Sequence, residues 1–385
     1  MNTIYMDNAA TSFPKPASVY EAVDYFNRHL GGNPGRGSHQ ATLRAGTVVL
    51  EARENLAQLF NIADSAQIAF TLNVTDALNT ALKGILRPGD HVVSTSMEHN
   101  SVARPLYRLA QEGVEWTAVP CAADGSLDPE NIRQAIRPNT RMICMLHASN
   151  LTGTIMPVKE VGKIAREHEV LFLLDAAQTA GILPVDVIEQ NIDLLAFTGH
   201  KALMGPQGTG GLYVRPGLYV RTLKEGGTGA LSEHLEHPDF MPDHLESGTP
   251  NTPGIAGLLA GVRFVMETGL EAIRQRELQT TRLLMDGLAD VSGITLYGPA
   301  DIHLRTAVIP FNIAGIDCGE LSLHLDHEFG IITRAGLHCA PLAHRTIGTL
   351  EAGACRISPG FFTTEREVEA VIRAVAQIAR QALAG

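Results

Sequence analysis

The chain has 385 residues, of which 45% are hydrophobic and 18% are charged, and this composition predicts a globular protein of one very large domain or two ordinary ones. It carries 30 Lys and Arg against 41 Asp and Glu, and the net charge of −11 argues against nucleic acid and against an anionic membrane as partners. The five cysteines form no CxxC pair, so we expect a reducing compartment, no disulfide framework and no metal site. Residues 1–13 lack the features of a signal peptide, and no apolar stretch is long enough to cross a bilayer, which indicates a cytoplasmic protein.

Short apolar runs alternate with helical patterns between about residues 67 and 214. The expected buried strands are residues 92–95, 114–120, 141–146, 170–174 and 194–197. The expected helices are residues 77–86, 131–136 and 158–168. Strands that alternate with helices predict a mostly parallel sheet with helices on both faces.

The pattern changes after Gly254, where one long helix is expected over residues 255–291. Strands are expected near residues 294–296 and 307–313, and Thr364 and Glu367 form a capping box in front of a last helix over residues 368–383. We therefore expect a large domain over residues 14–254. Residues 1–13 and 255–385 would form a smaller α+β domain, with the long helix as the bridge between the two.

Lys201 follows the apolar run 194–197 and precedes a glycine-rich segment, residues 205–211. A lysine at the mouth of a buried sheet is a candidate for Schiff-base chemistry, because desolvation lowers the pKa of its amine. An isolated lysine is more often a solvated surface residue, so this interpretation depends on the residues around it.

Polar side chains follow four of the expected strands, namely His99, Asn150, Asp175 and Lys201. Because the carboxyl ends of parallel strands meet at one edge of a sheet, this convergence predicts an active site there. Asp175 could face the cationic ring nitrogen of a cofactor or cap a helix. His99 could stack on a planar ring or simply complete a polar edge.

Thr75 stands in front of the helix expected over residues 77–86 and is a natural N-cap. The N-terminus of a helix offers free N–H groups to a phosphate, although an ordinary cap is the simpler interpretation. Ser247 and Thr249 form a second hydroxyl cluster at a turn.

Cys339 lies in the segment 334–341, whose glycine, histidine and proline are typical of a loop. Arg334 and His338 could favour its thiolate, which is the nucleophilic form. The remaining cysteines lie in apolar or strand-like contexts and are expected to be inert: Cys121, Cys144, Cys318 and Cys355. Arg356 stands among apolar and small residues, which indicates a carboxylate partner, either a substrate or an acidic side chain of the protein.

Together these segments resemble the class V aminotransferase family, and within it the cysteine desulfurase and selenocysteine lyase branch. The segments that carry the resemblance follow one another along the whole chain: YMDNAAT at 5–11, GRGSH at 35–39, NVTD at 73–76, EH at 98–99, NLTGT at 150–154, DAAQ at 175–178, TGHK at 198–201, GTPN at 248–251, RAGLHC at 334–339 and Arg356. The resemblance implies an α/β protein of pyridoxal-phosphate fold type I, with a mostly parallel seven-stranded sheet in the large domain and a smaller α+β C-terminal domain. The short interval from Cys339 to Arg356 is similar to that of the desulfurases with a compact cysteine loop.

The resemblance also implies a role for each matching residue. Lys201 would bind the cofactor, pyridoxal 5'-phosphate, covalently, and His99 would stack on its ring. Asp175 would pair with the ring nitrogen, and Gln178 with the phenolic oxygen. The phosphate would be held by Thr75, Asp76, Thr198, His200 and, from a partner subunit, Thr249. The substrate would be bound by Arg356, Asn150, Arg334, Asn8, Ala9 and His39.

The implied reaction converts L-cysteine to L-alanine, with Lys201 moving the Cα proton and Cys339 receiving the sulfur as a persulfide. The implied partners are a second copy of the chain in a homodimer and a sulfur-acceptor protein. The alternative is a selenocysteine lyase, or a lyase or aminotransferase for another amino acid; Cys339 discriminates, because an aminotransferase needs no thiol. A scaffold that only binds the cofactor is disfavoured, since it would have no use for Lys201 and Asp175.

Overall fold

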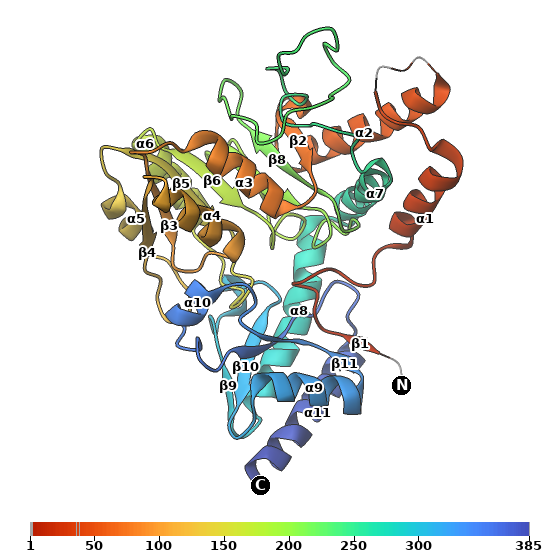
Figure 1. Cartoon of the computed structure of the whole chain (residues 1–385). Helices are drawn as coiled ribbons and strands as arrows, with labels where there is room; N and C mark the ends of the chain where they lie inside the picture. The colour runs from red at the N-terminus through yellow and green to blue at the C-terminus, as the bar shows by residue number, and fades with distance from the viewer. Residues whose placement is uncertain (1–2, 36, 38, 385) are drawn as a thin grey trace.

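The computed structural model describes residues 3–35, 37 and 39–384, and it has two parts that meet along one side of a large sheet. Figure 1 shows the large sheet with its helices in the upper part and a smaller sheet, with the chain's C-terminal helix, below. The N-terminal strand lies in the lower part, beside segments from the last third of the chain.

The large sheet contains seven strands among the described residues, in the spatial order β2-β8-β7-β6-β5-β3-β4. Their bounds are β2 Ile68–Thr71, β3 His91–Thr95, β4 Glu115–Val119, β5 Thr140–Leu146, β6 Leu171–Asp175, β7 Leu194–Thr198 and β8 Gly210–Val214. Strand β8 pairs antiparallel with both of its neighbours, and the other pairs are parallel. The prediction of a mostly parallel seven-stranded sheet is therefore confirmed.

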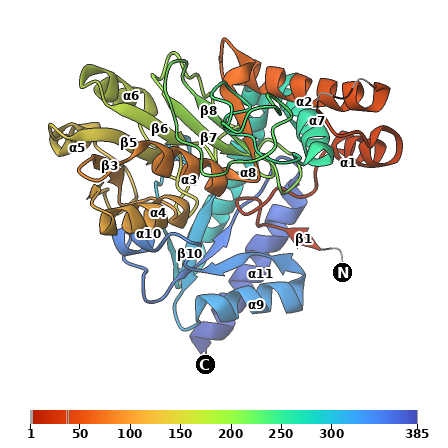
Figure 2. The ribbon, with the colours of Figure 1, turned by 45° about the horizontal axis from the view of Figure 1, so that its top comes forward.

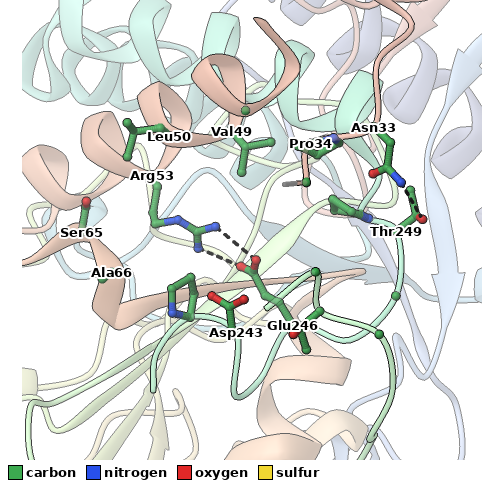
Figure 3. A pocket seen from close by; sticks show the side chains of 18 residues that line it. Asn33, Pro34, Val49, Leu50, Arg53, Ser65, Ala66, Asp243, Glu246 and Thr249 are labelled. Atoms are coloured by element: carbon green, nitrogen blue, oxygen red, sulfur yellow. Dashed lines mark hydrogen bonds and ion pairs between the residues drawn. The ribbon is translucent and has the colours of Figure 1, made fainter. Parts of the chain in front are cut away.

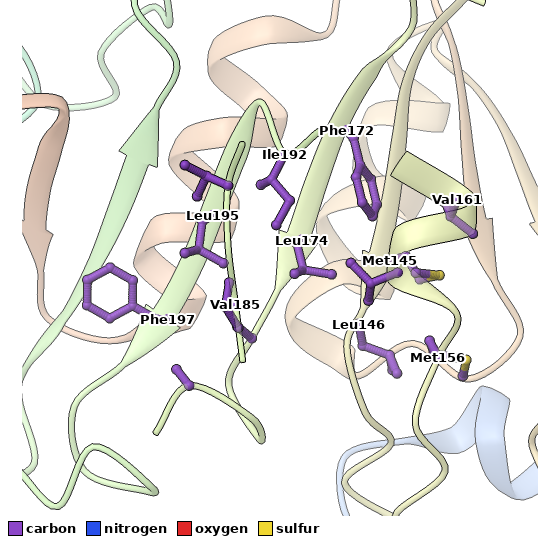
Figure 4. Packing of buried hydrophobic residues seen from close by; sticks show 14 of the residues in the cluster. Met145, Leu146, Met156, Val161, Phe172, Leu174, Val185, Ile192, Leu195 and Phe197 are labelled. Atoms are coloured by element: carbon purple, nitrogen blue, oxygen red, sulfur yellow. The ribbon is translucent and has the colours of Figure 1, made fainter. Parts of the chain in front are cut away.

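Both faces of this sheet are buried under helices, and the alternation of side chains along each strand explains why. On β6, Phe172 and Leu174 belong to one hydrophobic cluster, whereas Leu171 and Leu173 belong to another on the opposite face. Figure 4 shows part of the first cluster, where Val161 packs beside Phe172 and Leu195 lies near Phe197. Strands apolar on both faces require cover on both sides, as the sequence predicted.

The helices of the upper part are α1 Ala17–Tyr25, α2 Gln40–Leu59, α3 Val74–Ile85, α4 Asn100–Gln111, α5 Pro129–Ala135, α6 Val158–Glu167 and α7 Thr252–Thr268. Short helical segments of other pitch lie at Phe26–Leu30, Ser65–Gln67 and Ile302–Leu304. Helices α1 and α2 both pack against α7, and the three lie together at one end of the sheet in Figure 2.

The lower part is built on a small antiparallel sheet of order β12-β13-β10-β9 and a parallel pair of short strands. The strands are β1 Ile4–Tyr5, β9 Ile294–Leu296, β10 Ile309–Ile313, β11 Ile331–Ile332, β12 Arg334–Gly336 and β13 Ala354–Ile357. The helices are α8 Leu270–Ala289, α9 Cys318–Phe329, α10 Pro341–Thr346 and α11 Glu365–Ala384. Helices and antiparallel strands segregate here as in an α+β unit, which confirms the predicted architecture.

The single helix predicted over residues 255–291 is wrong, because the chain forms two helices, α7 and α8, that are separated at Gly269. Gly269 has a φ of 84°, in the region that favours glycine and that no helix can continue through. Helix α7 packs on α1 and α2, whereas α8 packs on α11 and β9. The exact division of the chain into two domains stays a prediction.

Two smaller sequence features can be checked directly. The capping box is present: the Thr364 backbone N–H donates to Glu367 Oε2 at 2.7 Å, and the Glu367 N–H donates to Thr364 Oγ1 at 3.3 Å. Of the helices formed by the described residues, none is both long and apolar enough to cross a membrane.

Helix α6 packs closely against the backbone of Gln190, and this contact requires that Gly162 has no side chain. A Cβ there would lie 1.9 Å from the carbonyl oxygen of Gln190. We predict that Gly162→Ala lowers the free energy of unfolding by about 2 kcal/mol, as overpacking does. Gly46, inside α2 with nothing within 4 Å of a built Cβ, is the matched control. Gly46→Ala should stabilise the protein by about 0.5–1 kcal/mol, because alanine loses less backbone entropy on folding. Urea denaturation of both variants checks this, and equal stabilities would contradict it.

Candidate active site

The carboxyl ends of strands β3, β5, β6 and β7 open into one cavity of about 480 Å³. The polar residues predicted from the strand ends all line it: His99, Asn150, Asp175 and Lys201. Further predicted residues on its wall are Ala9, Thr75, Gln178, Thr198, His200, Arg334, Cys339 and Arg356. The convergence expected at this edge of the sheet is therefore found.

Lys201 is held in a turn directly after β7, and Asp175 is the last residue of β6. Burial lowers the pKa of the Lys201 amine to about 8, although the negative charge of Asp175 acts in the opposite direction. Burial likewise raises the pKa of the Asp175 carboxyl. One oxygen of Asp175 accepts the backbone N–H of Ala177 at 2.9 Å, which fixes the carboxylate at the cavity wall.

His99 caps α4, and its ring orientation is set by Ser101. The Nδ1 atom of His99 accepts the Ser101 backbone N–H at 3.0 Å and lies 2.8 Å from the Ser101 hydroxyl. That hydroxyl also lies 2.8 Å from the hydroxyl of Thr75 at the start of α3. Burial and the nearby charge of Lys201 lower the pKa of His99 to about 4, so the ring is neutral at pH 7.

The start of α3 can bind an anion, but Thr75 is not its N-cap. Asn73 caps the helix instead, with its side-chain oxygen accepting the Asp76 N–H at 3.0 Å, and this leaves the Thr75 hydroxyl on the cavity wall. The Nδ1 atom of His200, in the same cavity, is buried and has no hydrogen-bond partner among the described residues. Free N–H groups at a helix start, hydroxyls and an unpaired ring nitrogen together suit a phosphate.

Gln178 and the N-terminal segment meet at the wall of the cavity. The side-chain amide of Gln178 donates to the carbonyl of Ala9 at 3.0 Å. Asn8, predicted to contact the substrate, instead donates from its amide to the carbonyl of Ser358 and lines a smaller neighbouring cavity of about 40 Å³, which Lys201 and Gln178 also border.

Arg356 makes an ion pair within the protein, which was one of the two partners considered for it. Its Nη2 lies 2.7 Å from Asp7 Oδ1, and its Nη1 donates to the carbonyl of Asn150 at 2.8 Å. Arg334 binds the other oxygen of Asp7, with Nε 2.9 Å from Oδ2. Arg356 still borders the cavity, and its Nε is buried without a partner among the described residues.

Cys339 lies in the segment between β12 and α10 and is exposed, whereas the other cysteines are buried or half-buried. Burial raises the pKa of Cys121 to about 11 and that of Cys355 to about 12, and it raises those of Cys144 and Cys318 as well. Since a thiol with a raised pKa is a poor nucleophile, Cys339 is the cysteine suited to react at this cavity.

One expectation about the Cys339 loop does not hold. His338 was expected to favour the Cys339 thiolate as a cation, but its ring is buried and burial lowers its pKa to about 3. It is therefore neutral, and its ring nitrogens face His344 and the carbonyl of Arg334. Arg334, half-exposed, and Arg356, buried, are the arginines on the cavity wall that Cys339 also lines.

Other predicted residues lie away from this cavity. Asp76 forms an ion pair with Lys224 at 3.2 Å and faces another depression, because it is on the outer side of the first turn of α3. His39 is exposed and caps α2, with Nδ1 accepting the N–H of Thr42 at 3.3 Å.

Thr249 lines a separate cavity of about 470 Å³, where its hydroxyl lies 3.5 Å from the amide of Asn33. Figure 3 shows this cavity, with Thr249 across from the buried Arg53 and its partner Glu246. Its expected contribution to a partner's site stays a prediction.

Two residues of the site were missed from the sequence. Asp7 is buried and binds both Arg334 and Arg356. The sequence offered one sign of this role, because Asp7 is the acidic residue of the segment 5–11, which carried part of the resemblance. Ser101 lines the cavity and orients His99. In the sequence, Ser101 is only a hydroxyl residue two positions after His99, and such a residue is equally common at the start of an ordinary helix.

Comparisons with known proteins identify the family of the chain. The family model described as "Aminotransferase class-V" matches residues 4–371. A probable cysteine desulfurase of Methanothermobacter thermautotrophicus is 34% identical over 98% of this chain and 94% of its own. A cysteine desulfurase of Pectobacterium atrosepticum is 33% identical over 98% of this chain and 93% of its own.

Solved structures show the same fold. The apo structure of the cysteine desulfurase from Thermococcus onnurineus superposes with a TM-score of 0.91 at 32% identity, covering 98% of this chain and 95% of that one. The cysteine desulfurase CsdA of Escherichia coli superposes with a TM-score of 0.87 at 28% identity, covering 99% and 94%. The predicted α/β fold of these enzymes is therefore confirmed, and the chain belongs to the class V aminotransferase family.

Proposed function

We propose that this protein is a cysteine desulfurase, which takes the sulfur of L-cysteine, releases L-alanine and holds the sulfur as a persulfide on Cys339. The observation that carries the proposal is that the exposed thiol of Cys339 and the amine of Lys201 line one cavity. The relatives and structures named cysteine desulfurase support the same reaction. An aminotransferase would have no use for a thiol at this place.

We propose pyridoxal 5'-phosphate as the cofactor, because the polar groups on the cavity wall match its parts. The start of α3, the hydroxyls of Thr75 and Thr198 and the unpaired Nδ1 of His200 suit the phosphate. Asp175 suits the ring nitrogen, the neutral His99 ring suits a stacking contact, and the amide of Gln178 suits the phenolic oxygen. When bound, this cofactor supplies an electron-withdrawing ring that acidifies the Cα–H bond of the amino acid joined to it.

The residues of this chain then bind the amino acid and move its protons. Lys201, whose amine has a pKa near 8, accepts the Cα proton and returns a proton later. Arg356 and Asn150 bind the α-carboxylate, and Arg334 adds positive charge at the mouth. Arg356 can take this role beside its pair with Asp7, since a guanidinium has five N–H donors and its Nε has no partner among the described residues.

The sulfur step uses the thiolate of Cys339, which attacks the sulfur of the substrate. The new S–S bond forms as the Cβ–S bond breaks, and the electron pair of that bond stays on the substrate carbon, which takes up a proton. Alanine is the product, and Cys339 is left as a persulfide. No external oxidant or reductant is needed for these atoms and electrons to balance.

We also propose a cytoplasmic homodimer in which Thr249 completes the phosphate site of the partner. Its support is that Thr249 lines a second cavity, together with glycines and Asn33, and not the cavity of Lys201. The exposed position of Cys339 fits transfer of the sulfur to an acceptor protein.

Lys201 should be the attachment point of the cofactor. Borohydride treatment of the holoenzyme should leave the cofactor on the Lys201 peptide, and Lys201→Ala should abolish this attachment. In the apoprotein, attachment should accelerate as pH rises through about 8, because only the neutral amine reacts. Lys15 is the control, because its pKa is also lowered to about 8 but its amine donates hydrogen bonds to the carbonyls of Ser12 and His200. Lys15→Met should keep the attachment; cofactor found on another lysine would contradict the assignment.

Arg356→Ala should raise the KM for cysteine, with a loss in kcat/KM equivalent to roughly 2–4 kcal/mol, because a charge-assisted contact to the carboxylate is lost. Asp7→Asn is the matched variant, since it removes the ion pair and leaves the guanidinium in place. It should lower the unfolding temperature with a smaller change in KM. If both variants lose stability alike and neither changes KM, Arg356 has only a structural role.

Cys339→Ser should abolish sulfur release from cysteine and leave cofactor binding intact. Peptide mass analysis after incubation with cysteine should find one added sulfur on the wild-type protein, at Cys339. The half-buried Cys121, whose pKa is raised to about 11, provides the control. Cys121→Ser should retain activity. Full desulfurase activity in Cys339→Ser would refute the persulfide route and favour a lyase that needs no thiol.

A further inference from the structure

The backbone at Cys339 has an unusual conformation that something must maintain. His338 has a φ of 50° and Cys339 a φ of 55°, so two consecutive residues that are not glycine lie in the left-handed region. Residues with a Cβ adopt this region rarely, because the Cβ atom crowds the following carbonyl. Such conformations persist where surrounding contacts determine them, and they concentrate at functional sites.

The carbonyl oxygens of these two residues accept hydrogen bonds from residues next to the seven-stranded sheet. The side-chain amide of Asn150 donates to the carbonyl of His338 at 2.8 Å, and the backbone N–H of Asn100 donates to the carbonyl of Cys339 at 2.8 Å. Asn100 directly follows His99, so a single hydrogen bond links the reactive cysteine to the residue beside the proposed cofactor ring. These bonds fix the peptide groups but not the side of the loop that faces α10.

That side is held by two nearly parallel histidine rings joined by a hydrogen bond. The rings of His338 and His344 are 5.5 Å apart at their centroids and only 8° from parallel, and both are buried. Nδ1 of His338 lies 3.2 Å from Nε2 of His344, and Nδ1 of His344 lies 2.7 Å from the hydroxyl of Thr349. Nε2 of His338 lies 3.3 Å from the carbonyl of Arg334.

The direction of this chain of hydrogen bonds follows from its last member. A carbonyl oxygen can only accept, so Nε2 of His338 carries the hydrogen and Nδ1 accepts. His344 must then donate from Nε2, which leaves its Nδ1 to accept from the hydroxyl of Thr349. Both rings are neutral in this arrangement, in agreement with burial, which lowers the pKa of His338 to about 3 and that of His344 as well. Every nitrogen in the chain has one partner of the right kind.

We propose that the chain Thr349–His344–His338 positions Cys339: it holds the left-handed turn so that the sulfur atom faces the cavity of Lys201. This inference rests on the proposed desulfurase function and adds positioning residues to it. None of the three side chains needs to touch the substrate. Since reaction rates depend steeply on the placement of the attacking atom, loss of the chain should slow sulfur transfer and leave cofactor and substrate binding unchanged.

Thr349 allows the cleanest test, because its hydroxyl can be removed or kept with little change in shape. Thr349→Val removes the donor, and Thr349→Ser keeps it. We expect Thr349→Val to lower the single-turnover rate of persulfide formation on Cys339 by about tenfold or more, with KM for cysteine and the cofactor absorption spectrum unchanged. Thr349→Ser should restore most of the rate. Thr281→Val is the control for replacing a buried threonine by valine, because the Thr281 hydroxyl has no partner among the described residues. This variant should be fully active.

A second pair of variants covers the case in which Thr349→Val does not fold. His344→Gln keeps an N–H that can donate to Nδ1 of His338, whereas His344→Leu does not. We expect faster persulfide formation in His344→Gln than in His344→Leu, and a matching difference in the rate at which iodoacetamide alkylates Cys339. A wild-type protein that forms no persulfide would overturn the proposed function. A wild-type protein that does, together with equal rates in both members of each pair, would overturn the positioning role alone.

Discussion

The carboxylate of Asp7 ties together parts of the chain that are far apart in sequence. One oxygen binds Arg356 of β13 and the other binds Arg334 of β12, while Arg356 also binds the carbonyl of Asn150 behind β5. The N-terminal segment, the small sheet and the edge of the large sheet therefore meet at one buried ion pair. Removing Asp7 would leave the buried guanidinium of Arg356 without its counter-ion, and breaking a buried pair in this way costs about 3–5 kcal/mol. The wall of the cavity that faces Lys201 depends on this contact.

Desolvation is the physical effect that gives the remaining groups their chemistry. The cavity lowers the pKa of Lys201 and of His99, and it raises that of Asp175, so each group is shifted toward its neutral form. A neutral amine can accept a proton, which an ammonium cannot, and a neutral imidazole adds no positive charge beside Lys201. The same effect makes the buried cysteines inert. In the proposed function, burial thus supplies a base at Lys201 and a neutral ring at His99, and it leaves Cys339 as the reactive thiol.

The sequence was informative where one local rule decided the structure. Strands apolar on both faces had to be covered, and polar residues at the ends of parallel strands had to share an edge, so the large sheet and the cavity with Lys201 and Asp175 could be predicted. It was misleading where two rules compete over a few residues. Asn73 and Thr75 are both good caps, and Asn73 wins because its oxygen reaches the N–H of Asp76; Gly269 can sit inside a helix or end one. The partners of Asp7 could not be predicted, because a counter-ion 327 residues away from Arg334 leaves no local pattern, and its place in the segment 5–11 was the only sign that it belongs to the site.

The position of Cys339 reconciles two demands on its sulfur. In the proposed reaction it has to face the cavity to meet the substrate, and it has to be open to solvent to pass sulfur on. A long mobile loop could meet both demands in turn, but residues 337–340 are the whole connection between β12 and α10, and Asn100 and Asn150 bind its carbonyls. Because so short a loop cannot move far, the sulfur of Cys339 has to meet both demands from one position. Its side chain lines the cavity and is exposed to solvent. In the proposed reaction the acceptor must therefore approach the rim, and Leu337, an exposed apolar side chain beside Cys339, is part of the surface it would meet.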